Sequence, residues 1–530
     1  MIRDRIFHRK VYFFLLIVLA AALPLSVFTS SLVQFLLVLN WIVEGNFREK
    51  WHRLKNSTAF LVLSLFFLLH LAGMAWSTDM QYGLHDLKIK LPLLVLPFLV
   101  VASDALTIRE LRIILTTFIT GCIAGSFASV LALIEVLGVD ITDYRDASLF
   151  IGHIRFALMI VLSIMFSAYL FLIKPEGEGR YLRGLYLFAL IWLPVFLVIL
   201  RSLSGIVILL VLLFIFSLIL VQSVKGRLGR FVLTVLICIL PLFMVVYTGS
   251  VVHRFYTFEQ VDFDHLDSLT LEGNRYIHYP QKRDTENGHY VWLYLCPEEL
   301  EHAWEQVSEY DYMGKTENGN DIRITLIRYL TSKGLRKDAV GVKQLDSSDV
   351  TAIEQGVANH IYLNRFALHP RIYELVWEFD RYRLGYSPND KSLIQRYYYL
   401  KAGLSIASEN LLYGVGTGDV RKAFMRYYEE NDSPLRQERR RRAHNQYLTF
   451  VVAFGIPGLL VCLFALIYPV FLRRRWRSYM ALVFLLTMAL SMLAEDTLEN
   501  NSGVVLFSFF YALFIFGPKC NIYPPCHCTG

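Results

Sequence analysis

The residues with the clearest chemical capacity lie at 436–458, RQERRRRAHNQYLTFVVAFGIPG, where a polar segment ends and an apolar one begins. A run of four arginines, residues 439–442, ends two positions before His444. Guanidinium groups bind phosphate oxygens through paired hydrogen bonds, and an imidazole exchanges a proton near neutral pH. If this stretch lies on the outer side of a membrane, the combination favours group transfer from a lipid-linked phosphate donor.

The composition assigns the chain to the helical membrane proteins. Of its 530 residues, 55% are hydrophobic and 18% are charged, and the mean hydropathy is +0.44. Soluble globular proteins carry about 25% charged residues. Many apolar runs approach the roughly 17–25 residues that a membrane-spanning helix needs. We therefore predict an all-α polytopic membrane protein with one polar insert. The net charge of +7 reflects the loops described below and does not indicate nucleic-acid binding.

The apolar runs predict twelve transmembrane helices. They lie near residues 11–27, 29–43, 58–75, 89–103, 110–137, 155–173, 184–200, 203–223, 230–248, 445–471, 478–493 and 502–516. The second and fourth are short and need tilt or local thinning of the bilayer. No small-residue cleavage site follows the first run, so we interpret it as a retained helix.

The loops between these helices alternate in charge, and cytoplasmic loops carry an excess of lysine and arginine. The basic loops contain Arg3, Arg5, Arg9 and Lys10; Arg48, Lys50, Arg53 and Lys55; Arg109 and Arg112; Lys174, Arg180 and Arg183; Lys225, Arg227 and Arg230; and Arg473, Arg474, Arg475 and Arg477. The other side holds Lys88, Lys90, Arg145, Arg155 and Arg201. This pattern predicts that both termini are cytoplasmic and that His444 faces outward.

The same pattern divides the chain into domains. We expect a membrane domain at 1–248, an outward-facing domain at 249–443, a second membrane domain at 444–517 and a cytoplasmic tail at 518–530. Helical patterns at 297–310, 321–334, 349–363 and 370–385 predict a mostly α-helical outward domain, preceded by turns and a hairpin. The tail holds Cys520, Cys526 and Cys528 in a spacing that matches no standard zinc site, so we favour a disordered tail over metal binding.

His444 stands at the predicted start of the tenth helix. The N–H groups of a helix N-terminus favour anions and tend to keep an imidazole neutral, which suits a general base. A capping or interfacial histidine is the alternative. Upstream lie Arg396, in SLIQRYYYLKAG, and the glycines Gly414, Gly416 and Gly418 of YGVGTGDV. Alternating glycines let backbone N–H groups approach a phosphate, although a plain turn is the more common reason for such a pattern.

The order of these motifs resembles the O-antigen ligase and polymerase superfamily of bacterial envelope glycosyltransferases. An arginine in a helix is followed by GVGTG, then AHNQYL, then FGIPGLL, all within 391–460. GHIRFAL at 152–158 and EDTLENNSG at 495–503 extend the resemblance, which covers the hydropathy of nearly the whole chain. In the insert, TLIRYLTSKGLRKDAVGV at 325–342 is similar to the Bacteroidetes-type branch.

The resemblance implies a GT-C-like, metal-independent transferase of the bacterial inner membrane that uses no cofactor, with the insert in the periplasm. The donor would be a glycan on undecaprenyl pyrophosphate, and the acceptor a hydroxyl of lipid A-core, a glycan or a protein. His444 would assist the acceptor hydroxyl, and Arg396 would engage the pyrophosphate. A second family arginine follows a serine between the seventh and eighth helices. Here that turn reads LRSLSG, with Arg201 displaced by two positions and Leu203 in the usual place.

Other polar residues could support this site: Arg155, Asn445, Arg442, Glu495, Asp496 and Glu499. The three acidic residues lie at an outward turn between the last two helices and could orient His444 or the acceptor. A solvated polar loop is the alternative. For the arginines at 439–442 we favour anionic headgroups over the diphosphate, because four solvated arginines form a diffuse site.

Asp262 and Asp264 form a DxD pattern, which metal-dependent glycosyltransferases use to hold a metal. No nucleotide-binding βαβ pattern surrounds it, so we predict a surface turn there and no metal site.

Other functions remain as alternatives. A polysaccharide polymerase and a protein O-oligosaccharyltransferase fit the same residues, and a surface assembly protein without catalysis is a third possibility. A lipid-glycan flippase or exporter is disfavoured, because ion-coupled transporters need ionisable groups inside the membrane. Such groups are nearly absent from the apolar runs, with Glu135 and His70 near helix ends as the exceptions.

Overall fold

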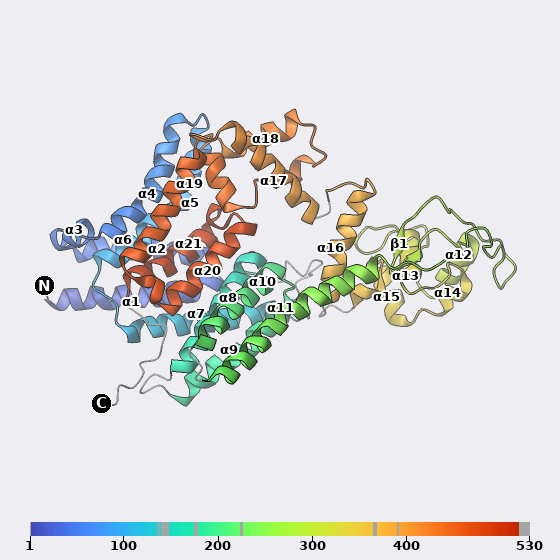
Figure 1. The fold of residues 1–530 in the computed structure, drawn as a ribbon, viewed down its shortest axis with the longest axis horizontal. Coiled ribbons are helices and arrows are strands. Elements are labelled where there is room, and N and C mark those ends of the chain that lie inside the picture. Colours follow the sequence, from blue (N-terminus) through green and yellow to red (C-terminus); the bar gives the residue numbers. More distant parts are fainter. Residues whose placement is uncertain are drawn as a thin grey trace. The chain divides into compact units, whose positions relative to one another are not determined.

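The computed structural model describes residues 2–134, 136, 138, 148–173, 179–222, 226–363, 368–389 and 392–518. The chain forms two compact units, the first from residues 1–223 and 385–530 and the second from residues 224–384 (Figure 1). Several residues used in the predictions lie outside the described residues, namely Glu135, Arg145, Lys174, Lys225, Cys520, Cys526 and Cys528. Most of the predicted tail, from residue 519 onward, lies outside them as well.

The first unit consists of helices (Figure 1). Its N-terminal part contains α1 (Ile2–Leu25), α2 (Val27–Glu44), α3 (Phe47–Lys55), α4 (Thr58–Ala72), η1 (Gly73–Trp76), α5 (Met80–Lys90), α6 (Pro92–Ala102), α7 (Ile108–Leu133), α8 (His153–Ile173), α9 (Arg180–Ile199) and α10 (Leu203–Gln222). Its C-terminal part contains α17 (Ser392–Glu409), α18 (Val420–Glu430), η4 (Gln437–Arg439), α19 (Gln446–Leu472), η5 (Arg475–Arg477), α20 (Tyr479–Ala494), η6 (Thr497–Glu499), α21 (Asn501–Tyr511) and the π-helical turn η7 (Ala512–Phe516).

The second unit begins with the long apolar helix α11 (Arg227–Phe255). It continues through β1 (Thr285–Glu286), β2 (His289–Tyr290), α12 (Pro297–Glu305), α13 (Ile322–Ser332), α14 (Ala339–Lys343), α15 (Ser347–Glu354), η3 (His360–Leu363) and α16 (Leu368–Arg383). The two strands form an antiparallel hairpin. The predicted helix 349–363 is too long, because the chain turns at Gly356, whose φ of +88° ends α15.

The described helices confirm the fold class. Eight of them are long and apolar enough to cross a membrane, namely α1, α2, α4 with η1, α7, α8, α9, α11 and α19, and α10, α20 and α21 with η7 are shorter apolar helices. The chain is an all-α polytopic membrane protein. Within the described residues, every predicted apolar run falls on helical structure, but the fourth differs in form. There, α6 has only 11 residues and follows α5, which ends at Lys90.

The boundary of the second unit differs from the predicted one. The outward position of residues 249–443 stays a prediction, but in the packing of the chain residues 385–443 belong to the first unit and residues 224–248 to the second. The reason is apolar packing of α17 on α19. A Cβ atom added at Gly403 of α17 would lie 2.7 Å from the Leu448 side chain of α19, so glycine permits this close approach. Tyr399 and Ile406 of α17 are buried in the same core.

A bend in α19 explains the FGIPG motif. Gly455 has φ 68° and ψ −174°, which is not helical. Residue 457 is proline and has no N–H, and Ile456 donates its N–H to Leu411 O at 2.8 Å instead of to α19. The carbonyl groups of Val452 and Ala453 are thereby freed from the helix and need other donors.

The GVGTG loop supplies these donors. Val415 N–H donates to Val452 O at 2.8 Å, and Gly416 N–H donates to Ala453 O at 2.9 Å. The two motifs thus form one structural unit that holds residues 411–418 against α19, which begins immediately after His444 and Asn445.

Candidate active site

The backbone places His444 just before α19, not inside it. Asn445 is the N-cap, and its side chain accepts a hydrogen bond from Leu448 N–H at 3.0 Å. His444 has a left-handed φ of 49°, a conformation that L-residues seldom adopt and that needs local support. That support includes a hydrogen bond from His444 N–H to Oδ2 of Asp496 at 3.1 Å. We expected His444 to be the first residue of the helix, but α19 begins two positions later, at Gln446.

The imidazole of His444 is held on two sides. Nδ1 lies 3.3 Å from Oε2 of Glu495, and the ring stacks on Tyr399 of α17 with centroids 5.3 Å apart and an interplanar angle of 22°. The Tyr399 hydroxyl donates to Arg439 O at 2.6 Å, which fixes the tyrosine in turn. The side chain of His444 keeps 23% of its surface exposed, so a substrate can reach the imidazole.

Glu495 follows the end of α20 and is buried. Burial by itself raises the pKa of its carboxyl, but the hydrogen bond with His444 and the positive charges of Arg396 and Arg155 outweigh burial and lower the pKa below its ordinary value. Glu495 is then ionised at neutral pH and accepts the Nδ1–H of His444. This leaves Nε2 of His444 as the ring nitrogen with a free lone pair.

Arg396 of α17 binds the other oxygen of the same carboxylate. Its Nη2 pairs with Oε1 of Glu495, and its Nη1 donates to Ala494 O at 2.7 Å. The arginine side chain is about one third exposed. The structure therefore brings together His444, Arg396 and Glu495, three residues that the sequence analysis singled out from positions up to 99 apart in the chain.

The other two candidate arginines lie near the starts of α8 and α10. Arg155 is in the first turn of α8, and its charge acts on Glu495. Arg201 lies in the turn between α9 and α10, with a left-handed φ of 50°. A Cβ atom added at Gly205 of α10 would lie 3.0 Å from Ala157 of α8, so these two turns are at the same end of the helices.

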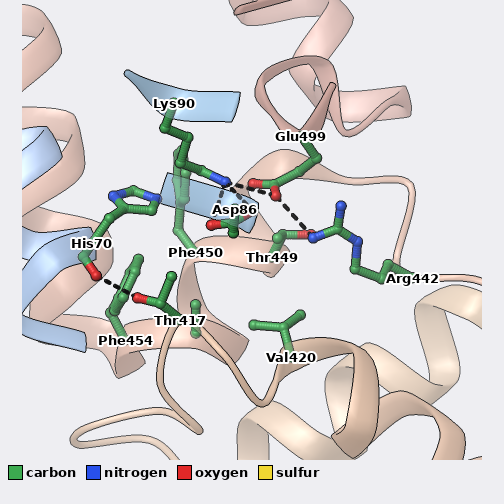
Figure 2. Close-up of a pocket in the computed structure, with 11 residues that line it drawn as sticks. His70, Asp86, Lys90, Thr417, Val420, Arg442, Thr449, Phe450, Phe454 and Glu499 are labelled. Atoms are coloured by element: carbon green, nitrogen blue, oxygen red, sulfur yellow. Dashed lines mark hydrogen bonds and ion pairs between the residues drawn. The ribbon is translucent and has the colours of Figure 1, made fainter. Parts of the chain in front are cut away.

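A second group of charges contains Asp86, Lys90, Glu499 and Arg442 (Figure 2). Glu499 accepts from Nη1 of Arg442 at 2.8 Å and from Nζ of Lys90 at 2.9 Å through Oε2, and from Nε2 of Gln446 at 2.8 Å through Oε1. Lys90 also pairs with Asp86, at 2.7 and 2.8 Å. Burial raises the pKa of Glu499, but Lys90 and Arg442 outweigh burial and lower it below its ordinary value.

Asp496 completes the acidic turn that surrounds His444. Its Oδ1 accepts from Thr449 Oγ1 at 2.7 Å, while Oδ2 accepts from His444 N–H. Burial raises its pKa, although Arg442 opposes that effect. The predicted alternative of a solvated polar loop at 495–499 does not hold, because Glu495 and Glu499 are buried and bonded.

The run of arginines at 439–442 does not act as one group. Arg439 and Arg441 are exposed, which agrees with contact to anionic headgroups. Arg442 is instead directed inward to Glu499 (Figure 2), and its pKa is raised because that carboxylate outweighs the effect of burial. Its role is therefore to hold the loop in place.

The three glycines have packing roles. The N–H of Gly414 donates to Asn410 O at 3.0 Å, that of Gly416 to Ala453 O, and that of Gly418 to Oγ of Ser77 at 2.9 Å. A Cβ atom at Gly414 would lie 2.2 Å from the backbone of Ala453. Because these amides already have acceptors, they count against the expected phosphate contact, and we leave the glycines out of the donor site.

The DxD pattern lies in the second unit and forms an exposed turn. The N–H of Asp264 donates to Oδ1 of Asp262 at 3.0 Å, and Nδ1 of His265 lies 2.8 Å from Oδ2 of Asp262. This is the surface turn that the sequence predicts.

Residues 356–463 match the family model described as O-antigen ligase. This part of the chain is similar to the O-antigen ligases. The match supports membership of the O-antigen ligase and polymerase superfamily, and the Bacteroidetes-type branch remains a prediction. No protein of curated function matches the chain. The matched range holds Arg396, Arg442 and His444, whereas Lys90, Glu495 and Glu499 lie outside it.

Sequence reasoning missed four residues that support the site: Asp86, Lys90, Tyr399 and Thr449. A signal was present for the first two, since aspartate and lysine four residues apart face each other on a helix. Tyr399 and Thr449 gave no signal, because their partners are distant in the chain. Lys90 and Asp86 are ionisable side chains buried among the helices. The scarcity of ionisable residues in the apolar runs is therefore a weaker argument against a transporter than the sequence suggested.

Proposed function

We propose that the protein transfers a glycan from an undecaprenyl-pyrophosphate-linked donor to an acceptor hydroxyl at the periplasmic face of the bacterial inner membrane. The match of residues 356–463 to the O-antigen ligase model supports this reaction class. The observation that carries the proposal is the carboxylate of Glu495, which binds the imidazole of His444 with one oxygen and the guanidinium of Arg396 with the other. A candidate base and a candidate phosphate-binding cation are thereby held next to each other.

In the proposed reaction, the acceptor oxygen attacks the anomeric carbon while the bond from that carbon to the phosphate oxygen breaks. Nε2 of His444 accepts the hydroxyl proton, and the pyrophosphate leaves with the bonding electrons. Direct displacement inverts the anomeric carbon. Since pyrophosphate is a good leaving group, base assistance of about 10²–10⁴-fold is sufficient. Glu495 stabilises the imidazolium that forms.

Arg396 has the chemistry to stabilise the charge that develops on the pyrophosphate, because a fixed guanidinium acts most strongly where water is scarce. Arg155 and Arg201, at the same end of the helices, are further donors for the diphosphate. These arginines supply charge without a metal, so we expect turnover to persist in excess chelator and to need no cofactor. A strict requirement for magnesium or manganese would overturn the metal-independent scheme and direct attention to Asp262 and Asp264.

The experiment that tests the proposal separates donor binding from transfer. His444→Ala should bind lipid-linked donor normally in nanodiscs but transfer it about 10²-fold more slowly, the scale of a lost general base. His444→Gln should not restore the rate, because an amide does not take up a proton. His265→Ala, a histidine in the exposed turn of the second unit, is the matched control and should behave as wild type. A wild-type rate for His444→Ala would refute the assignment of the base.

The acceptor is identified by glycan profiling of a deletion strain. We expect the loss of lipopolysaccharide laddering, which assigns lipid A-core as the acceptor. A single attached repeat would instead assign the chain to polymerisation, and unglycosylated target proteins would assign it to protein O-glycosylation.

A further inference from the structure

Lys90 is one of the most deeply buried charged side chains among the described residues, with 1% of its side-chain surface exposed. It projects from the last turn of α5 between two carboxylates, Asp86 on its own helix and Glu499 in the turn before α21 (Figure 2). Burying a lysine is costly unless the ammonium is fully paired, as it is here. A buried charge at this position therefore calls for an explanation.

The second partner of Lys90 explains its position. Glu499 binds Arg442 and Gln446, which stand two residues before and two residues after His444. The side chain of Gln446 also accepts Leu498 N–H at 2.8 Å, which ties the start of α19 to the turn that carries Glu499. One carboxylate thus fixes both sides of the loop that presents the histidine.

The space around Lys90 is too small for a substrate. The pocket lined by Lys90, Glu499, Arg442, His70 and Thr417 has a cavity volume of only about 10 Å³. A site of this size admits about one water molecule. Lys90 therefore acts on other residues of the protein.

We propose that Lys90 is a positioning residue for His444 and that it acts through Glu499. This inference rests on the proposed function of His444. The buried Glu499 needs a second cation to stay ionised while it binds Arg442, and Lys90 supplies it. With Glu499 ionised, Arg442 and Gln446 keep His444 in its left-handed conformation beside Glu495. Without Lys90, we expect the loop to shift, and small displacements of a catalytic group reduce the rate strongly.

The test is a double-mutant cycle on purified protein with lipid-linked donor. Lys90→Met should lower kcat by about 10-fold or more and leave the KM for donor unchanged. Glu499→Gln should lower kcat similarly. The double variant should be no slower than Glu499→Gln within about twofold, because both changes act through one carboxylate. The proposal would be overturned if the fold-loss of kcat in the double variant equalled the product of the two single losses. A wild-type kcat for Lys90→Met would overturn it as well.

Two controls separate positioning from loss of structure. Lys88→Met makes the same substitution at an exposed position of the same helix and should leave kcat unchanged. Leu193→Ala removes a buried side chain of α9 and should lower thermal stability while leaving kcat per folded molecule unchanged. If Leu193→Ala loses kcat as Lys90→Met does at matched stability, the effect is general loosening and the proposal fails.

If Lys90→Met does not accumulate, Lys90→Met with Asp86→Asn takes its place in the cycle, because the second change removes the buried Asp86 carboxylate that would otherwise lose its cation. His444→Ala distinguishes the two levels of the argument. A rate loss in His444→Ala together with a wild-type rate in the Lys90 variants refutes the positioning role alone. A wild-type rate in His444→Ala refutes the proposed function itself.

Discussion

Oε2 of Glu495 lies 3.3 Å from Nδ1 of His444, at the point where α20 ends and the chain turns toward α21. The depressed pKa of the carboxyl keeps it ionised, so it fixes the Nδ1–H tautomer of the imidazole. Nε2 is then the nitrogen that takes up a proton. The carboxylate binds His444 through one oxygen and Arg396 through the other, so in the proposed reaction a single turn serves both the acceptor and the donor.

Glu495→Gln tests this relationship. The amide keeps the shape of the side chain but loses the charge that fixes the tautomer and stabilises the imidazolium. We expect kcat to fall by about 10–100-fold, with donor binding changed little, measured by single-turnover transfer. Glu438→Gln, at an exposed glutamate six residues before His444, is the control and should have no effect. A wild-type kcat for Glu495→Gln would contradict the pair.

Arg396→Lys should weaken the binding of the lipid-linked donor. Lysine keeps the charge but loses the planar fork that grips two oxygens. We expect donor affinity to fall by about 10-fold, because one good charge-assisted hydrogen bond contributes about 1.5–3 kcal/mol. Arg421→Lys in α18 is the matched exposed control. Normal donor binding by both Arg396→Lys and Arg396→Ala would move the phosphate site to Arg155, Arg201 or the exposed arginines before His444.

Gly414→Ala should damage folding and leave the donor site itself intact. The position has φ +64°, and a Cβ atom would meet the backbone of Ala453. We expect a loss of at least about 2 kcal/mol, from the strained backbone and the clash together. Thermal unfolding in detergent measures this loss, and Gly319→Ala at an exposed turn is the control for a positive φ without a close neighbour. A fully stable variant with weakened donor binding would restore the phosphate-loop interpretation.

The pH dependence of stability should report on Glu499. Its depressed pKa gives stability that is fully present above the unfolded value of about 4.3 and is lost as pH falls through the folded pKa. We therefore expect the difference in Tm between wild type and Glu499→Gln to stay constant from about pH 7 to pH 5 and to shrink below about pH 4. A difference that already shrinks between pH 7 and 6 would show that Glu499 is not held as an ion.

Cysteine labelling tests the predicted orientation. In a background without native cysteines, Glu317→Cys in the second unit should react with an impermeant reagent in intact spheroplasts, because the basic loops predict an outward position. Arg48→Cys, exposed in α3, should react only after lysis. The reverse pattern would invert the topology and remove the periplasmic reaction with it.

The sequence by itself determined the fold class and named His444, Arg396 and Glu495 as candidate site residues. Hydrophobic runs of membrane-spanning length place helices reliably, because burial in lipid leaves few other structures for the backbone. His444 and Arg396 were recognisable because their types and their order with GVGTG and FGIPG are unusual. The acidic turn that contains Glu495 and Glu499 was recognisable because it lies between the last two predicted helices.

Tertiary structure decided what these residues contact. The glycines looked like a phosphate loop, but each N–H group already has an acceptor. Gly414 donates to Asn410 O, Gly416 to a carbonyl freed by the bend at Gly455, and Gly418 to the Ser77 hydroxyl, and the last two contacts arise only from the packing of distant segments. From the sequence we interpreted Lys90 as a loop charge, but its partner Glu499 lies 409 positions further along the chain. Local sequence patterns indicate secondary structure and the chemical type of the side chains. The pairing of buried charges depends on long-range packing, which the spacing of neighbouring residues does not encode.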